Sequence, residues 1–229
     1  MKLNSNTLKY LGAAAMLTDH IAMCFFPVAT PLGFIMRTLG RLTAPIMFTL
    51  FADSFKFTKS KKDFGIRLFI FALISQIPYA LIHYQSFYEP DYNVIATFFL
   101  SFLMLLCYEK IKNPVLKYIC VAGILALSRF CDWGIVGPMW TLAAFLCDTR
   151  KKRIVGFTLV SAYHIVNQFA ICFENDYHIA CALCQMGVLL FIPLYLCCNG
   201  QKGKRSKFSK WFFYCFYPLH LLVLYFATM

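Results

Sequence analysis

Nine apolar runs, each of about the length that a helix needs to cross a bilayer, follow one another along the chain. A crossing helix takes about 20 apolar residues, so nine of them use about 180 residues. Too little of the 229-residue chain then remains for a sizeable soluble domain, and residues 1–229 are expected to form one integral membrane domain. The runs cover residues 8–26, 35–55, 65–84, 93–108, 115–130, 134–148, 154–172, 178–197 and 211–228, the fourth and sixth being short.

The composition also favours a bilayer over water as the solvent. Hydrophobic residues make up 60% of the chain and charged residues 14%, and the mean hydropathy is +0.65. A soluble domain is about half apolar with about a quarter of its residues charged, so polar residues are too few here to cover a water-facing globule. We therefore expect an all-α, polytopic transmembrane bundle in which sequence neighbours pack as antiparallel helices.

The connections between the runs alternate in charge, which predicts an orientation. Loops rich in Lys and Arg stay in the cytoplasm, so the N-terminus is expected there and the C-terminus outside. Short clusters between apolar runs do not form the single basic face that nucleic-acid binding requires. Acidic residues in the other connections are Glu89, Asp91, Asp132, Glu174 and Asp176. Nineteen of the 22 basic residues lie in five connections: Lys2 and Lys9; Lys56, Lys59, Lys61, Lys62 and Arg67; Lys110, Lys112 and Lys117; Arg150, Lys151, Lys152 and Arg153; Lys202, Lys204, Arg205, Lys207 and Lys210.

Three arginines, Arg37, Arg41 and Arg129, lie on the predicted outer side, against this rule. An ionisable group inside a bilayer costs at least a few kcal/mol, so it faces the bundle interior and finds a partner. Arg37 and Arg41 are spaced i, i+4, which stacks them on one face of the second helix. Their guanidinium groups can hold a carboxylate, a phosphate or an oxyanion, and the alternative is that they snorkel to the interface. Pro45 is expected to disturb this helix just beyond them.

Asp19 and His20 lie within the first run, which has no small-x-small cleavage site and is expected to be a retained span. Histidine suits general-base catalysis because its unperturbed pKa lies near neutrality. The alternative is a histidine that only hydrogen-bonds a neighbouring helix. Adjacent helical residues point about 100° apart, so one of the pair is expected to face a cavity. The other would tie the helix to a neighbour such as Arg41.

Polar residues also interrupt the later runs. The amides of Gln76 and Asn93 are interpreted as groups that hydrogen-bond between helices. His164 and Gln168 share a helix face at i, i+4 spacing. His220 lies in the last run, and its place relative to His20 stays open at this level.

Most of the eleven cysteines lie within apolar runs. Cys181 and Cys184 form a CxxC pair, but no second pair or histidine follows at the spacing of a zinc site. The cysteines are therefore interpreted as small apolar packing residues, and no metal site is expected.

Several short motifs together resemble the TraX family of integral membrane proteins. Each is weak by itself, but they follow the family's order over nearly the whole chain. They are Thr18 to His20, Leu39-Gly40-Arg41 with Pro45-Ile46, Phe55-Lys56, Ala72 to Leu81 (ALISQIPYAL), Asn93-Val94, Asp132-Trp133-Gly134 and Tyr217 to Leu222 (YPLHLL).

This resemblance implies an acetyltransferase. The family's namesake is linked to N-terminal acetylation of conjugative pilin, and the family is similar to the type 3 membrane acyltransferases. Those enzymes take acyl groups from cytosolic acyl-CoA and use an intramembrane histidine and arginine. Carried onto this sequence, the resemblance implies that His20 is the catalytic base and Arg41 its electrostatic partner, with support from Asp19 and His220.

The implied reaction moves an acetyl group from acetyl-CoA to an amine or hydroxyl, either directly or through an acetyl-histidine. The acceptor is a pilin-like peptide N-terminus, or a cell-surface or small molecule. Basic cytoplasmic loops are expected to meet the phosphates of the nucleotide. The residues expected to bind the coenzyme are Lys59, Lys61, Lys62, Lys151 and Lys152, and those expected to bind substrate are Arg37, Gln76, Asn93, Asp132, His164 and His220.

Two other functions stay open. A small-solute or proton-coupled transporter would use the same His, Asp and Arg residues as a relay or substrate site. Nine spans do not divide into two equal halves, which weighs against an inverted-repeat transporter. The other alternative is a non-catalytic membrane component of a conjugation or secretion assembly. In each case the chain is expected to be a multi-pass protein of the bacterial cytoplasmic membrane.

Overall fold

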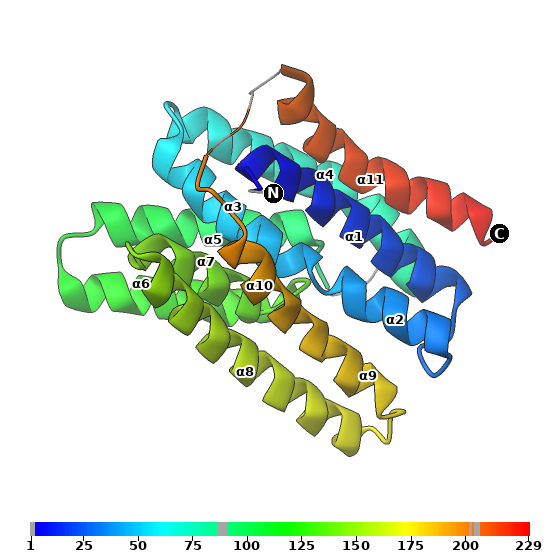
Figure 1. Cartoon of the computed structure of the whole chain (residues 1–229). Coiled ribbons are helices and arrows are strands. Elements are labelled where there is room, and N and C mark those ends of the chain that lie inside the picture. The colour runs from blue at the N-terminus through cyan, green and yellow to red at the C-terminus, as the bar shows by residue number, and fades with distance from the viewer. Residues whose placement is uncertain (1–2, 87–90, 202, 204–206) are drawn as a thin grey trace.

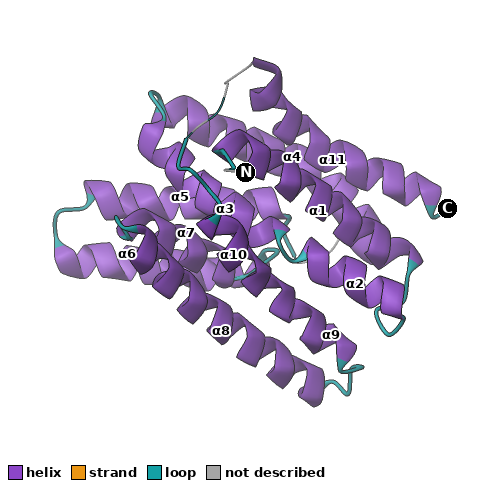
Figure 2. Cartoon of the chain, in the orientation of Figure 1, coloured by secondary structure: helices purple, strands orange, loops and turns teal. Residues whose placement is uncertain are grey.

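The computed structural model describes residues 3–86, 91–201, 203 and 207–229, and the regular elements among them are helices (Figures 1 and 2). Of the basic and acidic residues in the charge pattern, Lys2, Glu89, Lys202, Lys204 and Arg205 lie outside this part of the chain. The elements are α1 (Ser5–Phe25), α2 (Pro31–Gly40), α3 (Thr43–Phe57), α4 (Lys61–Tyr84), α5 (Val94–Lys110), α6 (Pro114–Leu127), the 3₁₀ helix η1 (Ser128–Phe130), α7 (Val136–Leu146), α8 (Arg150–Glu174), α9 (Ala180–Leu183), the 3₁₀ helix η2 (Cys184–Leu190), α10 (Phe191–Leu196) and α11 (Lys207–Ala227).

Each apolar run corresponds to helical structure, so the prediction of an all-α chain is confirmed. Three of the runs contain more than one helix: residues 35–55 lie in α2 and α3, residues 115–130 in α6 and η1, and residues 178–197 in α9, η2 and α10. By length and composition, two of the described helices, α4 and α8, are long and apolar enough to cross a membrane. The nine crossings and the orientation of the termini stay predictions.

The second run is interrupted, as expected, but the break lies before Pro45 and not at it. α2 ends at Gly40 and α3 begins at Thr43, with a two-residue turn between them. Pro45 therefore lies in the first turn of α3, where a backbone N–H has no intrahelical partner to lose. Gly40 lets the end of α2 approach α1 closely, because a Cβ atom at this position would overlap the side chain of Asp19.

Side-chain caps in the sequence set where many of the helices begin. Before six of them stands an Asn, Ser or Thr whose side-chain oxygen accepts a backbone N–H of the first turn. Proline occupies the start of α2 and α6, where its fixed φ suits a helix. The capping residues are Asn4, Thr30, Ser60, Asn93, Asn113 and Thr149.

The centre of the bundle is built by helices that are distant in sequence. α3 packs extensively against α7, and α4 packs extensively against α11. The expected packing of sequence neighbours is also present, as between α1 and α2 or between α4 and α5. Phe48 of α3 is fully buried between Phe98 of α5 and Trp140 of α7, with ring centroids 4.5 and 6.3 Å away. These aromatic contacts hold α3 against α5 and α7.

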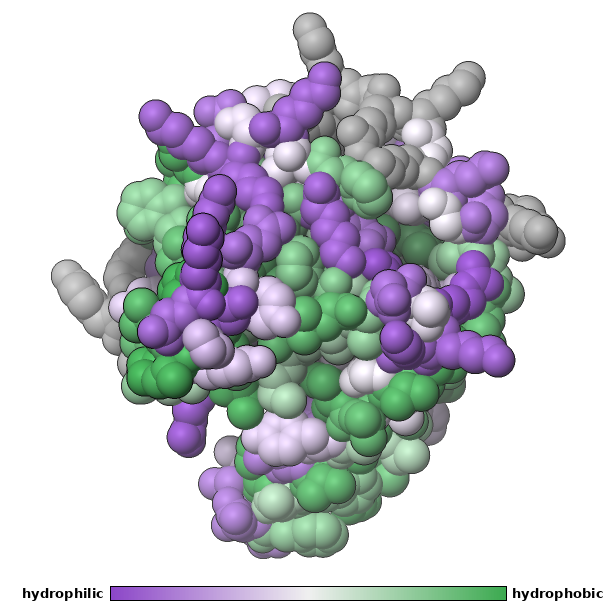
Figure 3. Space-filling model, turned by 90° about the vertical axis from the view of Figure 1, so that its left-hand side faces the viewer, coloured by the Kyte–Doolittle hydropathy of each residue, from purple (hydrophilic) through white to green (hydrophobic). Residues whose placement is uncertain are grey.

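Connections rich in Lys and Arg gather at one end of the bundle. In Figure 1 the α3–α4, α5–α6 and α7–α8 connections lie on the left. The α1–α2 and α8–α9 connections and the C-terminus lie on the right. Figure 3 looks onto the left-hand end, where hydrophilic side chains surround the upper part of the face. The fold therefore separates in space the two kinds of connection that alternate in the sequence, as a membrane orientation set by basic loops requires.

Candidate functional site

Asp19 of α1 holds two arginines that come from the end of α2. Its Oδ2 accepts a hydrogen bond from Nη1 of Arg37 at 2.9 Å and another from Nη2 of Arg41. The ring of Trp133 covers the Arg41 guanidinium, whose central carbon lies 5.3 Å from the ring centroid. Charges removed from water need close partners to offset their desolvation. The expected tie between the first helix and Arg41 is therefore present, and Arg37 shares it.

His20 meets His220 of α11 and His83 of α4 where the three helices come together. Nδ1 of His20 lies 3.2 Å from Nε2 of His220, and the ring centroids are 5.0 Å apart. The rings of His20 and His83 lie 5.9 Å apart and nearly perpendicular. The question that the sequence left open about His220 is answered. His83 was missed because its only signal was a titratable side chain near the end of an apolar run.

Backbone contacts determine the neutral tautomer of each of these rings. Each Nδ1 lies within hydrogen-bond distance of the carbonyl oxygen four residues earlier in its own helix. A carbonyl only accepts, so Nδ1 must carry the hydrogen and Nε2 the lone pair. Nε2 of His220 faces His20, whereas Nε2 of His20 and Nε2 of His83 bond none of the described residues. The carbonyl partners are those of Met16 (2.9 Å from His20), Tyr79 (3.1 Å from His83) and Phe216 (2.8 Å from His220).

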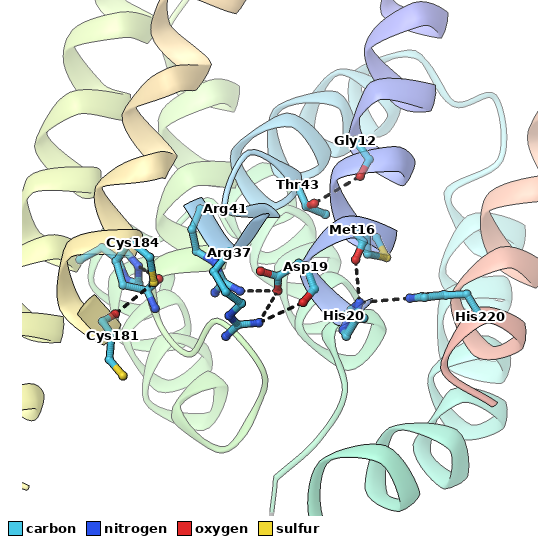
Figure 4. Close-up of polar contacts among 12 residues, drawn as sticks. Gly12, Met16, Asp19, His20, Arg37, Arg41, Thr43, Cys181, Cys184 and His220 are labelled. Atoms are coloured by element: carbon cyan, nitrogen blue, oxygen red, sulfur yellow. Dashed lines mark hydrogen bonds and ion pairs between the residues drawn. The ribbon is translucent and has the colours of Figure 1, made fainter. Parts of the chain in front are cut away.

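The ion cluster and the histidines lie on different sides of α1 (Figure 4). Asp19 and His20 are consecutive helical residues, so their side chains diverge. Asp19 faces α2, and His20 faces α11. Arg41 accordingly contacts Asp19 and Trp133, and the structure brings His220 rather than Arg41 to His20.

A cavity of about 600 Å³ leads from the basic end of the bundle toward the histidines. Its inner end is lined by Met16, Val94 and Tyr217. The Met16 carbonyl is the acceptor for His20 Nδ1, and Tyr217 precedes His220 by less than one helical turn. Residues near the basic end that line the cavity include Ser5, Lys9, Asp53, Thr58 and Arg67. The lining thus extends from the Lys- and Arg-rich end to Met16, about one helical turn from His20, and the three clustered histidines lie just beyond it.

The family model described as TraX protein matches residues 4–228. The chain belongs to the TraX family. A curated relative, "Probable fimbrial assembly protein FimC, serogroup H1" of Dichelobacter nodosus, is 27% identical over 235 residues, which cover 97% of this chain and 94% of that protein. No solved structure matches. The family resemblance drawn from the short motifs is therefore confirmed.

In this TraX-family chain, the side chains of Gln76 and Asn93 hydrogen-bond to backbone groups where α4 and α5 meet. Oδ1 of Asn93 accepts the N–H of Ile95 at 3.0 Å. Nδ2 of Asn93 donates to the Ala72 carbonyl at 2.7 Å and to Oε1 of Gln76 at 2.8 Å. Nε2 of Gln76 donates to the Asp91 carbonyl at 2.9 Å. Their interpretation as interhelical hydrogen-bonding residues agrees with these contacts, which engage both amides.

His164 lies beyond Trp133, away from the other histidines. Its ring is 5.4 Å from that of Trp133, and its Nε2 is 3.3 Å from Oε1 of Gln185 in η2. The partner of His164 is therefore Gln185, although Gln168 shares its helix face in the sequence.

Asp132 lies in the turn between η1 and α7. Its backbone N–H donates to the Tyr92 carbonyl at 2.7 Å, and its carbonyl accepts from Oγ1 of Thr97 at 2.6 Å. Burial raises the pKa of the Asp132 carboxyl to about 6, although the positive charge of Arg41 acts in the opposite direction. Asp132 is thus a carboxyl near the arginines rather than near His20.

The five lysines expected to bind the coenzyme lie outside the cavity lining. Lys61 pairs with Glu109, and Lys152 pairs with Asp148 at 3.3 Å. Lys9 and Arg67 are the cations that line the cavity among the described residues. The side chains of Lys59, Lys62 and Lys151 are exposed, as is that of Arg129, the third displaced arginine.

Proposed function

We propose that this TraX-family protein transfers an acetyl group from acetyl-CoA to an acceptor amine or hydroxyl, with His20 as the general base. The observation that carries the proposal is the cavity that leads from cationic residues to Met16, about one helical turn from His20, whose Nε2 bonds none of the described residues. The fimbrial assembly in the name of the Dichelobacter nodosus relative supports an acceptor on a fimbrial or pilus subunit, such as a peptide N-terminus.

The cavity suits a long donor with charge at one end. Its volume of about 600 Å³ lies within the range of small-molecule sites, about 300–1,000 Å³. Arg67 and Lys9 line it, and Nε of Arg67 is buried without a hydrogen-bond partner among the described residues. A phosphate oxygen of coenzyme A would satisfy that N–H, and the arm with the thioester would extend toward Met16 and Tyr217. Lys59, Lys61 and Lys62 would raise the local concentration of the anionic donor.

His20 is suited to general-base catalysis by its fixed tautomer. Its Nε2 would take a proton as the acceptor attacks the thioester carbonyl carbon. The new C–N or C–O bond forms, the C–S bond breaks, and the proton passes from His20 to the thiolate to give the free thiol of coenzyme A. The Met16 carbonyl and Nε2 of His220 both face the Nδ1–H of His20, so they stabilise the positive charge that develops on the ring.

The ion cluster would orient α1 and offer one further donor group. Arg41 is held by Asp19 under Trp133, which suits a positioning residue that fixes α1 against α2. Arg37 uses Nη1 for Asp19, and its side chain is more exposed than that of Arg41, at 21% against 11%. Its other N–H groups are therefore the better placed to stabilise negative charge on a substrate.

Turnover of acetyl-CoA by the purified protein tests the proposal. Release of free thiol would be measured in detergent with peptide N-termini and with hydroxyl acceptors. His20→Ala should lower turnover by about 10²-fold or more, because general-base catalysis contributes about 10²–10⁴-fold. His178→Ala, an exposed histidine outside the cluster, is the control and should retain activity. Normal turnover by a folded His20→Ala protein would remove His20 from the mechanism.

A second candidate function is a non-catalytic component of a fimbrial or secretion assembly, which the name of the relative favours directly. It predicts that acetyl-CoA is not turned over and that His20→Ala still supports assembly. A transporter would likewise ignore acetyl-CoA, but it would move a solute across the membrane of reconstituted vesicles.

We also infer that the nine helical passes cross the bacterial cytoplasmic membrane with the basic end in the cytoplasm. The gathering of the basic connections at one end and the two long apolar helices support this. Cysteines introduced at Lys59 and at Asp176 should then show opposite reactivity toward an impermeant thiol reagent added to intact cells. Equal labelling of the two positions would contradict the orientation.

A further inference from the structure

His83 carries an imidazole nitrogen that the mechanism above does not use. It lies in the last turn of α4, at the end of that helix opposite the basic connections. Its Nδ1–H donates to the Tyr79 carbonyl at 3.1 Å, so Nε2 holds a lone pair, and none of the described residues bonds that atom. The rings of His83 and His20 are 5.9 Å apart. Two imidazole nitrogens with available lone pairs, from different helices, therefore belong to one site.

The chemistry of an amine acceptor requires two protons to leave. A peptide α-amino group has a pKa of about 7.7–8.0, so at neutral pH it is mostly an ammonium ion. One proton must leave before the nitrogen can attack, and a second leaves as the amide forms. The second proton ends on the thiol of coenzyme A through His20. The first has no place in the products and must reach water.

We propose that His83 takes this first proton from the ammonium group of the acceptor and releases it to water at the outer end of the bundle. The step rests on the proposed function. An N–H bond of the acceptor breaks, its electron pair stays on nitrogen, and the proton binds Nε2 of His83 before it passes to water. The acceptor nitrogen would thus lie beside the edge-to-face pair of His83 and His20, within reach of Nε2 of each ring, and His20 would receive a neutral amine.

The position of His83 gives the proton a short route out. The ring packs on Tyr79, with centroids 4.4 Å apart, and the next residue, Tyr84, is exposed. His83 itself is partly exposed, whereas His220 is buried. A proton on His83 therefore lies closer to water than one on the other ring that contacts His20.

Other titratable groups lie around this end of α4, and their effects on the pH dependence of the rate must be distinguished from the effect of His83. A change of pH also acts on these groups, so the test compares two acceptors in one protein instead of relying on a single pH profile. The groups are His20 and Asp19 of α1, Arg37 of α2, His220 of α11, Tyr79 and Tyr84 of α4 itself, and Asp91, which accepts from the Tyr84 hydroxyl at 2.6 Å.

The test compares His83→Asn with the wild-type protein on two peptides. One peptide has a free α-amino group as the acceptor. The other has a blocked α-amino group and a C-terminal hydrazide as the acceptor, and the hydrazide is neutral at pH 7. Asparagine keeps a donor for the Tyr79 carbonyl and removes the basic nitrogen. With the amine at pH 7, kcat/KM should fall at least tenfold. The loss should shrink as the pH rises above about 8 and the amine becomes neutral. The hydrazide should react within threefold of wild type, and added imidazole should restore part of the amine rate.

The outcomes separate this inference from the proposed function. Equal losses for both peptides at every pH, without rescue by imidazole, would assign His83 to structure and overturn the proton route. Unchanged amine turnover in His83→Asn would overturn it as well. If the wild-type protein turned over neither peptide, the proposed function itself would fail. His83→Gln is measured in parallel, so that the test remains decisive if His83→Asn does not fold.

Discussion

Gly40 lies where the end of α2 meets α1, and the structure leaves no space there for a side chain. The three nearest atoms to a Cβ built at this position belong to Asp19, with its Cγ at 2.7 Å. Because one of these atoms is the Asp19 Cβ, which is fixed to the α1 backbone, Gly40→Ala requires α2 to move away from α1, and this movement pulls Arg37 and Arg41 from the Asp19 carboxylate.

The expected cost lies between two limits. Overpacking of a dense contact costs about 1–3 kcal/mol when the backbone can shift. Breaking a buried ion pair costs about 3–5 kcal/mol, because a charge is left without its partner. Since the overlap involves the carboxylate itself, we expect Gly40→Ala to destabilise the protein by about 3 kcal/mol. For a chain of this length, that corresponds to a fall in Tm of about 6–12 °C.

The Tm is measured by thermal unfolding in detergent, where buried cysteine thiols become reactive as the protein unfolds. Gly123→Ala is the matched control, since a Cβ atom there meets nothing within 4 Å. Alanine favours a helix interior by up to about 1 kcal/mol, so the control should be neutral or more stable. The buried cysteines that report unfolding are Cys131, Cys172, Cys184 and Cys198.

A Tm of Gly40→Ala equal to that of Gly123→Ala would refute this reasoning. A double-mutant cycle provides the second check. Asp19→Gly removes all three atoms of the overlap, Cβ included, so Gly40→Ala should cost less in that background. The same cost in both backgrounds would show that the contact with Asp19 is not the cause.

Three further predictions address the cap of α5, the cavity and the turn before α7. Asn93→Ala should lower stability in thermal unfolding by about 2–3 kcal/mol, because it removes an N-cap and leaves the Ala72 carbonyl without its donor. Asn93→Ser keeps an uncharged capping oxygen and should lose less. Arg67→Gln should raise the KM for acetyl-CoA about tenfold with little change in kcat, since a hydrogen bond to a charged group contributes about 1.5–3 kcal/mol, and an unchanged KM would contradict a phosphate at Arg67. The pKa of Asp132 is raised from 3.8 to about 6 in the folded protein, so its contribution to stability is present below about pH 4 and is lost as pH rises through about 6. The loss amounts to up to about 3 kcal/mol, and Asp132→Asn should abolish this slope; equal pH dependence in the two proteins would contradict it.

The helices were predictable because continuous apolar runs and caps act locally. The run at 65–84 lies within α4 (Lys61–Tyr84), and the run at 154–172 lies within α8 (Arg150–Glu174). Ser60 and Thr149 cap these two helices through their own side chains. Each of these signals operates within a few residues and needs no partner from elsewhere in the fold.

The break after Gly40 was not predictable in the same way. The apolar run continues through it, and proline is the usual signal for an interruption. Here Pro45 begins α3, and the chain turns earlier, where Gly40 approaches Asp19. That approach depends on how α1 packs against α2, which the order of residues does not state.

The sequence by itself determined the helical segments, the family and the set of titratable residues that the apolar runs contain. Only the tertiary structure decided which of those residues meet. Asp19 contacts Arg37 and Arg41. His20 contacts His83 and also His220, which lies two hundred positions away in the sequence. The reason is physical. Helix periodicity determines how neighbouring side chains diverge, but the partner that each one finds depends on long-range packing of α1, α4 and α11.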